Sequence, residues 1–385
     1  MAAGADTLAV IATHLRPSKG FGGVAESTSE LIRTWAAAGK RLAVVVSDGS
    51  RESRAPTPAE FHKALGAPTE VYRARVAVRW GFGWGAPGAI LRAVHGAQHV
   101  YVSGIATWPT TLGALIASLL RRPHTIAVRG GLMAEHWAAI RRTRPAKAAF
   151  YRLMVFPTLR RATAVHAASE LEAAGVRALA PGVRVIVEPN AFAAPPLAPG
   201  DLTPPKGEGL QLLYLGRLSP EKGVLGFARF FAAARGQGDT LTIAGPAVGD
   251  YGREVVELCR TPGLAFVGEL PREALAARFR AAHALVLPSG VDGDVRENFG
   301  NVVVEALLHG RLALVTRGLA WDELEAGRVG VLFDRSLQDG SGALQRLREL
   351  ARERGVYRRC RQFAEARYSV DVVAANLWRA MFEGA

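Results

Sequence analysis

The sequence predicts an α/β protein made of two doubly wound, Rossmann-like domains. Short β-branched runs alternate with amphipathic segments of helical length along the 385 residues, which is the pattern of βαβ units around parallel sheets. This alternation occurs twice, once on each side of a proline-rich stretch. The length agrees with two domains, because a single hydrophobic core seldom grows beyond about 250 residues.

The proline-rich stretch, 191–209, holds five prolines and three glycines, and proline neither continues a helix nor donates to a strand ladder. We therefore expect a first domain over 1–190, a linker over 191–209 and a second domain over 210–365. Strands are expected in the first domain at 8–13, 41–47, 99–102, 124–128, 164–167 and 184–187, and in the second at 210–215, 241–244, 265–267, 284–287, 312–316 and 330–333.

Composition excludes several classes of protein. Hydrophobic residues make up 49% and charged residues 21% of the chain, which is ordinary for a compact protein and excludes disorder. Uninterrupted apolar runs are shorter than the ~18 residues of a membrane span, and the first residues lack the basic start of a secretory signal. The two cysteines, Cys259 and Cys360, fit a reducing compartment and exclude a disulfide scaffold. We expect a cytoplasmic location.

The net charge of +14 is unevenly distributed. Residues 1–190 hold 24 Lys and Arg against 11 Asp and Glu, whereas 191–385 hold 24 against 23. The first half is therefore the basic one, and a basic surface can face nucleic acid, an anionic membrane or a phosphorylated substrate. We expect no nucleic acid partner, because no binding motif accompanies the charge.

A glycine-rich turn with Gly22 and Gly23 leads from the first strand into a helix expected over 24–38. Such a turn offers free backbone N–H groups to an anion, and glycine lets the ligand come close. A tight turn without a ligand is the alternative. The glycine spacing differs from the dinucleotide fingerprint G-x-G-x-x-G, so the dehydrogenase interpretation is weak.

The strand expected at 210–215 is followed by a second candidate site. After Gly216, the side chains of Arg217 and Lys222 are placed to project toward the carboxyl end of the sheet, as a paired clamp for phosphate oxygens. Two solvated surface cations are the alternative.

A third candidate site, 297–307, combines two acids with the expected start of a helix. We expect Asn298 to cap a helix that ends near His309. Glu297 lies just before this helix. Glu305 lies inside it among apolar residues, where an unpaired acid costs several kcal/mol; a structural salt bridge is its alternative role. The amides expected to face a phosphate at the helix N-terminus are those of Phe299, Gly300 and Asn301.

Together these segments resemble a GT-B glycosyltransferase of the large retaining, family 4-like group, which includes sucrose synthases, mannosyltransferases and many lipopolysaccharide enzymes. Two further stretches, 128–132 and 166–170, resemble the branch that builds bacterial surface polysaccharides. The spacing of the matches covers nearly the whole chain. The main matches are Gly22-Gly23-Val24, Leu215-Gly216-Arg217-Leu218, Lys222-Gly223, Ala244-Gly245-Pro246, Phe266-Val267-Gly268, Leu287-Pro288-Ser289 and Glu297-x7-Glu305.

The resemblance implies transfer of a hexose from a nucleotide-diphosphate sugar, with retention at the anomeric carbon, to a glycan or lipid-linked glycan acceptor. In this family, the equivalent of Glu297 contacts hydroxyls of the donor sugar and that of Glu305 binds the ribose. The equivalents of Arg217 and Lys222 hold the diphosphate. The resemblance also implies a cleft between the two domains and a C-terminal helix, 366–385, that returns to the first domain. The other implied donor-binding residues are Gly22, Gly23, Gly216, Phe299, Gly300 and Asn301.

The GT-B fold usually works without a metal, and we expect neither metal nor cofactor. Asp292 and Asp294 mimic the metal-binding Asp-x-Asp of another glycosyltransferase fold, but we favour a polar turn, because two acids leave most ligands of a hard cation unsupplied. Arg129 stands where many relatives have His, and the resemblance implies a contact with the sugar or phosphate.

The segment 121–161 concentrates basic residues beside aromatic and aliphatic ones. On helices this pattern suits peripheral contact with an anionic membrane, here the inner face of the cytoplasmic membrane. A solvated face over a buried apolar stripe is the alternative. Two other functions stay open: a non-catalytic glycan- or nucleotide-binding protein and a sugar-nucleotide epimerase of the same fold.

Overall fold

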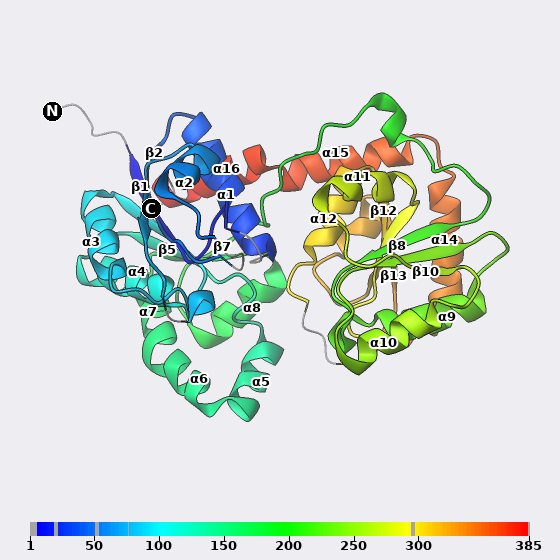
Figure 1. The fold of residues 1–385 in the computed structure, drawn as a ribbon, viewed down its shortest axis with the longest axis horizontal. Helices are drawn as coiled ribbons and strands as arrows, with labels where there is room; N and C mark the ends of the chain where they lie inside the picture. The colour runs from blue at the N-terminus through cyan, green and yellow to red at the C-terminus, as the bar shows by residue number, and fades with distance from the viewer. Residues whose placement is uncertain (1–5, 19–21, 51–53, 76, 294–296, 384–385) are drawn as a thin grey trace. The chain divides into compact units, whose positions relative to one another are not determined.

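Two parallel β-sheets organise the computed structural model, which describes residues 6–18, 22–50, 54–75, 77–293 and 297–383 (Figure 1). The chain divides into two units: unit 1 comprises Met1–Ala193 and Tyr368–Ala385, and unit 2 comprises Ala194–Arg367. Unit 1 holds a seven-stranded sheet and unit 2 a six-stranded sheet. The predicted fold class, two doubly wound Rossmann-like α/β domains, is confirmed.

The strand order of the unit 1 sheet is β3-β2-β1-β4-β5-β6-β7. Its strands are β1 Thr7–Ala12, β2 Arg41–Ser47, β3 Thr69–Tyr72, β4 His99–Ser103, β5 His124–Ala127, β6 Ala164–Ala167 and β7 Val185–Val187. Its helical segments are α1 Gly22–Ala37, α2 Pro58–Leu65, η1 Val78–Trp80, α3 Ala86–Gly96, α4 Trp108–Leu119, α5 Ala134–Thr143, α6 Pro145–Phe150, η2 Tyr151–Val155, α7 Phe156–Arg161, α8 Glu170–Leu179 and α16 Val370–Phe382.

Both faces of this sheet are buried, as the period-2 alternation along β1 shows. Ala9 and Ile11 pack into a core with α3, α4 and α7, whereas Leu8 and Val10 pack into a second core with α1, α2 and α16. A central parallel strand between two helical layers is therefore apolar throughout, which explains why such strands were predictable.

The C-terminal helix α16 belongs to unit 1 and packs against α1. Trp35 of α1 is buried and donates its indole N–H to the carbonyl of Ala374 at 2.9 Å. Val373, Leu377 and Trp378 complete the same core. Residues far apart in the sequence thus build one layer of unit 1.

The strand order of the unit 2 sheet is β10-β9-β8-β11-β12-β13. Its strands are β8 Gln211–Leu215, β9 Thr240–Ala244, β10 Leu264–Phe266, β11 Ala284–Leu287, β12 Leu312–Thr316 and β13 Gly330–Phe333. Its helical segments are η3 Pro199–Leu202, η4 Pro220–Lys222, α9 Val224–Ala234, α10 Gly249–Leu258, α11 Arg272–Arg280, α12 Asn301–Leu308, α13 Glu323–Ala326, α14 Gly340–Ala351 and α15 Val356–Tyr368.

The proline-rich stretch from Ala194 onward is part of unit 2. Two arginines hold its backbone there: Arg311 donates to the carbonyl of Thr203 at 2.9 Å, and Arg361 donates to that of Pro195 at 3.0 Å. Arg311 is almost fully buried, and burial lowers the pKa of its guanidinium.

Each segment expected to form a strand does so within one residue at either end. One strand, β3, was missed. Its sequence, Thr-Glu-Val-Tyr, is short and half polar, and it lies at the edge of the sheet with three of its four residues partly exposed. Among the described residues, no helix is both long enough and apolar enough to cross a bilayer.

Candidate active site

The switch point of the unit 2 sheet lies between β8 and β11, where the strand order reverses. Ligands of open α/β sheets bind outside the carboxyl ends of the strands at such a point. The chain leaves β8 through Gly216 and Arg217, and it leaves β11 through Pro288 and Ser289. These two exits bring several of the predicted residues together.

Lys222 and Glu297 meet at this switch point. The Nζ atom of Lys222 lies 2.5 Å from Oε2 of Glu297, and the Ser289 hydroxyl donates to the same carboxylate oxygen at 3.3 Å. The two charged side chains are 24% and 12% exposed. This ion pair is therefore shielded from solvent more than an ordinary surface pair, and the attraction between its two charges is correspondingly stronger.

Gly223 makes this meeting possible. It follows Lys222 in the left-handed conformation, with φ 69°, and a Cβ at this position would lie 1.9 Å from the carbonyl oxygen of Pro288. Only a residue without a side chain allows the turn after β8 to lie so close to the exit of β11.

Arg217 lies in the same turn with a different partner. Its guanidinium contacts Glu221 at 2.9 Å and its side chain is largely exposed. The hydroxyl of Tyr214 donates to the Arg217 carbonyl at 2.9 Å. Burial raises the pKa of Tyr214, and the carboxylates of Glu297 and Glu221 raise it further, which puts both acids near this phenol.

The helix after Glu297 begins later than expected. Its first residue is Asn301, and Gly300 with φ 77° caps it, so the predicted cap at Asn298 is wrong. A residue in the left-handed region interrupts helical geometry, which is why the helix cannot start at 298. Phe299 precedes this break, and its carbonyl accepts the indole N–H of buried Trp321 at 2.6 Å. Glu305 lies partly buried in the middle of the helix.

Asp292, half of the Asp-x-Asp mimic, binds the start of helix α9. Both of its carboxylate oxygens accept the backbone N–H of Gly226 at 3.0 Å, and the Tyr251 hydroxyl donates to it at 2.6 Å. Asp294 lies outside the described residues. Within the described ranges, no three His, Cys, Asp or Glu side chains are grouped as metal ligands.

The switch point of the unit 1 sheet lies between β1 and β4, and Arg129 follows the next strand, β5. Its guanidinium donates to Asn190 at 2.6 Å, to the Tyr101 hydroxyl at 3.1 Å and to Thr28 at 3.3 Å. Thr28 in turn shares a hydrogen bond of 2.7 Å with Ser103 at the end of β4. Arg129 is thus held in place by residues from three separate segments: α1, β4 and the loop after β7.

A buried histidine extends this network. His166 Nε2 lies 2.8 Å from the carbonyl of Glu188, which can only accept, so Nε2 carries the proton and Nδ1 accepts from Tyr101 at 2.7 Å. Burial lowers the pKa of His166 to about 3, and the charge on Arg129 adds to this effect. The neutral imidazole orients the Tyr101 hydroxyl toward Arg129 as an acceptor.

Gly22 and Gly23 are the first two residues of α1 and are exposed. They stand in unit 1, on the chain that leaves β1 at the switch point. The sequence did not single out Ser289 or Tyr214 as site residues. The signal for Ser289 was available, since it follows a strand whose carboxyl end borders the switch point.

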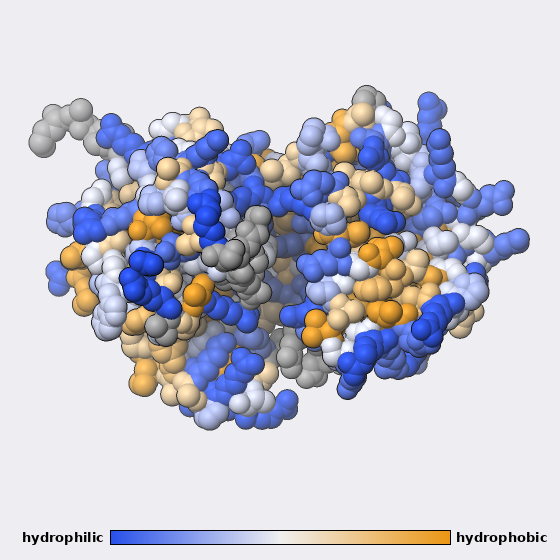
Figure 2. All heavy atoms as spheres, viewed as in Figure 1, coloured by the Kyte–Doolittle hydropathy of each residue, from blue (hydrophilic) through white to orange (hydrophobic). Residues whose placement is uncertain are grey.

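Most of the aromatic side chains in 121–161 are part of the core. Trp137, Tyr151 and Phe156 are buried and pack on one another, with Arg152 and Lys147 over the first two rings. Leu153 by contrast is 74% exposed. Figure 2 shows hydrophilic and apolar residues interspersed over α5 and α6.

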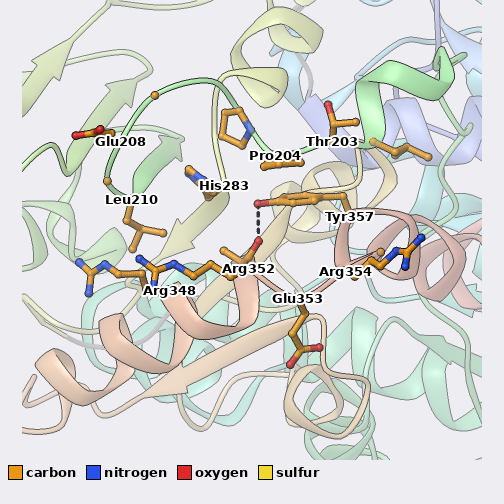
Figure 3. Close-up of a pocket in the computed structure, with 16 residues that line it drawn as sticks. Thr203, Pro204, Glu208, Leu210, His283, Arg348, Arg352, Glu353, Arg354 and Tyr357 are labelled. Atoms are coloured by element: carbon orange, nitrogen blue, oxygen red, sulfur yellow. Dashed lines mark hydrogen bonds between the residues drawn. The ribbon is translucent and has the colours of Figure 1, made fainter.

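A cavity of about 870 Å³ lies at the other end of the unit 2 sheet, where β8 and β11 begin (Figure 3). It is lined by the proline-rich stretch 202–210 and by the end of α14, with His283 and Tyr357 facing it. Burial lowers the pKa of His283 to about 4. The predicted site residues do not line this cavity.

Two successive family models match the chain. One, described as a glycosyl transferase 4-like domain, matches residues 22–191, and the other, described as glycosyl transferases group 1, matches residues 209–350. Together with the two Rossmann-like sheets, these matches define a GT-B protein. The chain belongs to the family 4-like glycosyltransferases, enzymes that transfer sugars.

Solved structures of similar fold agree. Sucrose-phosphate synthase from Thermosynechococcus elongatus is 18% identical with a TM-score of 0.69, covering 99% of this chain and 100% of that chain. HepE of Anabaena in complex with UDP is also 18% identical with a TM-score of 0.69, at 98% and 100% coverage. The lipopolysaccharide outer core galactosyltransferase WaaB is 17% identical with a TM-score of 0.66, at 98% and 100% coverage. No protein in the curated set matches the sequence significantly.

Proposed function

We propose that the protein is a retaining hexosyltransferase that moves a sugar from a nucleotide-diphosphate donor to a glycan or lipid-linked glycan in bacterial surface polysaccharide or lipopolysaccharide synthesis. The observation that carries this proposal is the Lys222–Glu297 ion pair at the switch point of unit 2. It holds a cation and an acid side by side where a ligand of this fold binds.

In this proposal, the cation serves the leaving group. Departure of the nucleoside diphosphate develops negative charge on the β-phosphate, which Lys222, Arg217 and the amides of Phe299, Gly300 and Asn301 stabilise. The donor phosphate replaces Glu297 as the ion-pair partner of Lys222. The carboxylate of Glu297, no longer paired, binds hydroxyls of the donor sugar. Glu305 binds the ribose hydroxyls. The reaction needs no metal or cofactor.

Several similar structures support a nucleotide donor and a surface glycan. HepE of Anabaena has been solved with UDP and with UDP-glucose, and WaaB is a galactosyltransferase of the lipopolysaccharide outer core. Two other functions compete with transfer: a binding protein would hold the donor without turning it over, and an epimerase would convert the donor without an acceptor.

The first experiment is thermal stabilisation by UDP, GDP, ADP and dTDP. A ligand at 100 times its dissociation constant stabilises the folded state by about 2.7 kcal/mol. We expect one diphosphate to stabilise the wild type, and to stabilise Glu305→Ala clearly less. Glu349→Ala, an exposed acid on α14, is the matched control and should respond as the wild type does.

Turnover of the corresponding sugar nucleotide, with and without acceptor glycans, then separates the three functions. Acceptor-dependent release of the diphosphate, with a product anomer matching that of the donor by NMR, supports retaining transfer. If no diphosphate stabilises the protein at millimolar concentration, the nucleotide-sugar proposal fails.

We also propose peripheral contact of 121–161 with an anionic membrane. Leu153 on η2 is 74% exposed among the basic residues of this segment. Two further exposed leucines directly precede the segment: Leu119 at the end of α4, which is 72% exposed, and Leu120 just after it. Cosedimentation with phosphatidylglycerol vesicles tests this. Leu153→Ser should weaken binding, whereas Val248→Ser, a control in unit 2 that is 66% exposed, should not.

A further inference from the structure

A chain of five aromatic side chains lies in the segments of unit 1 that follow β3, β4 and β5. The ring centroids of Phe82 lie 5.3 Å from Trp84, 4.9 Å from Trp108 and 6.2 Å from Trp80, and Trp80 lies 6.4 Å from Phe150. We call these five residues the ring platform. Its outermost member, Trp84, is 85% exposed.

The backbone under the ring platform is fixed by aromatic donors. The Tyr72 hydroxyl donates to the carbonyl of Gly81 at 2.9 Å, and the indole of Trp108 donates to that of Gly83 at 3.2 Å. The indole of Trp80 donates to the carbonyl of Ala106 at 3.0 Å. A large indole that is exposed on an anchored turn is well suited to bind a ligand. Covering its apolar area is favourable, and a turn that is already fixed loses little entropy on binding.

A cavity of about 480 Å³ opens beside Trp84, between the edge strand β3 and helix α3. Phe82 and Trp84 form an aromatic wall, and Arg73 and Arg75 stand on its rim. Both arginines are exposed, and neither has an ion-pair partner in the part of the chain that the structure describes. The cavity thus combines two aromatic rings set edge to face with these two unpaired guanidinium groups, beside the ion pair of Arg92 and Glu70.

The opposite end of the ring platform is also cationic. Lys147 is one turn before Phe150 on α6, with Arg79 and Arg144 nearby. Burial lowers the pKa of Lys147, and the charges on Arg144 and Arg79 lower it further. Cations that repel one another around an aromatic surface indicate a ligand that brings negative charge.

We propose that the ring platform and its cavity form a subsite for a glycan that carries carboxylate or phosphate groups, the acceptor of the transfer proposed above. Sugar rings lie flat on aromatic side chains through their apolar faces, and arginine forks bind carboxylate or phosphate in pairs of hydrogen bonds. A membrane is the less suitable ligand, because a bilayer contacts a convex apolar surface rather than a concave wall rimmed by arginines.

The identification of the glycan as the acceptor rests on the proposed function, whereas its binding does not. The test is an array of defined oligosaccharides, with neutral maltotriose and dextran fragments beside uronic-acid and phosphorylated oligosaccharides. It is probed with the wild type, Trp84→Ala, Trp84→Phe and the double variant Arg73→Gln/Arg75→Gln. Arg177→Gln, an exposed arginine on α8, is the matched control.

The wild type and Arg177→Gln should bind the anionic members of the array. Trp84→Ala should bind about tenfold more weakly and Trp84→Phe should recover most of the affinity. The arginine variant should lose the preference for charged over neutral glycans. Far-ultraviolet circular dichroism of each variant checks that the fold is retained.

Three results would overturn the proposal: no oligosaccharide binds the wild type better than Trp84→Ala, neutral and charged glycans bind equally, or Trp84 affects binding to phosphatidylglycerol vesicles alone. Stabilisation by nucleoside diphosphates is measured on the same preparations. If that stabilisation is absent while anionic glycans still bind through Trp84, the transfer function fails and the glycan subsite stands.

Discussion

Lys222 and Glu297 are 75 residues apart in the sequence, yet their side chains form an ion pair of 2.5 Å at the carboxyl ends of β8 and β11. The two residues lie in separate segments, and local structure alone does not bring them together. The strand order of the sheet brings them together, and Gly223 lets the two exits approach. The proposed donor site depends on this pair.

Removing either member of this pair should abolish most of the transfer activity. Lys222→Met and Glu297→Gln are each expected to lower kcat by about 10² to 10³, the usual cost of a lost electrostatic contact to the transition state. The double variant should be little worse than either single variant, because each single change already leaves its partner uncompensated. Steady-state kinetics of the four proteins give the coupling.

The exposed pair Arg229–Glu254 on α9 and α10 is the control. Breaking it with Arg229→Met should leave kcat within about twofold, since exposed pairs contribute little. Strictly additive effects of Lys222→Met and Glu297→Gln would mean that the two residues act independently.

Gly223→Ala should destabilise unit 2. The left-handed φ alone costs about 1 to 3 kcal/mol for a residue with a side chain, and the added Cβ also clashes with the carbonyl of Pro288. Gly355→Ala separates the two costs, because Gly355 has φ 78° and open space around it. Denaturant unfolding should show the larger loss for Gly223→Ala, and equal losses would refute the close approach.

Asp292→Asn should weaken the start of α9 without changing any metal dependence. The carboxylate accepts the Gly226 N–H and the Tyr251 hydroxyl, and losing such a helix cap costs about 1 kcal/mol. We expect the transfer rate of the wild type and of the variant to be the same in EDTA and in Mn²⁺. If the wild-type rate falls in EDTA and the rate of Asp292→Asn does not, Asp292 is a metal ligand instead.

The buried His166 should make unit 1 less stable in acid. Its pKa of about 3 in the folded state lies below the ordinary value of about 6.5 in the unfolded chain. Between these values the unfolded state binds more protons, so the free energy of unfolding decreases as the pH falls below about 6.5. His166→Gln should flatten this dependence in thermal unfolding between pH 7 and 5, relative to the exposed control His62→Gln.

Strands buried on both faces were predictable from sequence, because each is a short run of consecutive apolar residues. Lys222 and Glu297 could likewise be placed at the same edge of the sheet, since the carboxyl ends of all parallel strands lie at one edge. The start of α12 could not be predicted, because the left-handed Gly300 overrides the capping preference of Asn298. A cap preference is local, whereas the conformation of Gly300 depends on the neighbouring loop.

The ring platform was missed for a different reason. Three of its members, Trp80, Phe82 and Trp84, alternate with glycines in the sequence, which is a visible signal. Trp108 and Phe150 lie far along the chain, and sequence alone does not tell which aromatic residues meet. Tertiary packing decides that, as it decides that Trp137, Tyr151 and Phe156 face the core rather than solvent.

The docking of α16 on α1 has a consequence for synthesis on the ribosome. Residues 1–193 are synthesised first, yet their core lacks Val373, Leu377 and Trp378 until residues 194–367 have also been synthesised. Trp35 and its neighbours therefore stay uncovered throughout the synthesis of unit 2, although domains usually fold in the order of translation. Until α16 arrives, the nascent chain displays an apolar strip on α1, a natural binding site for chaperones.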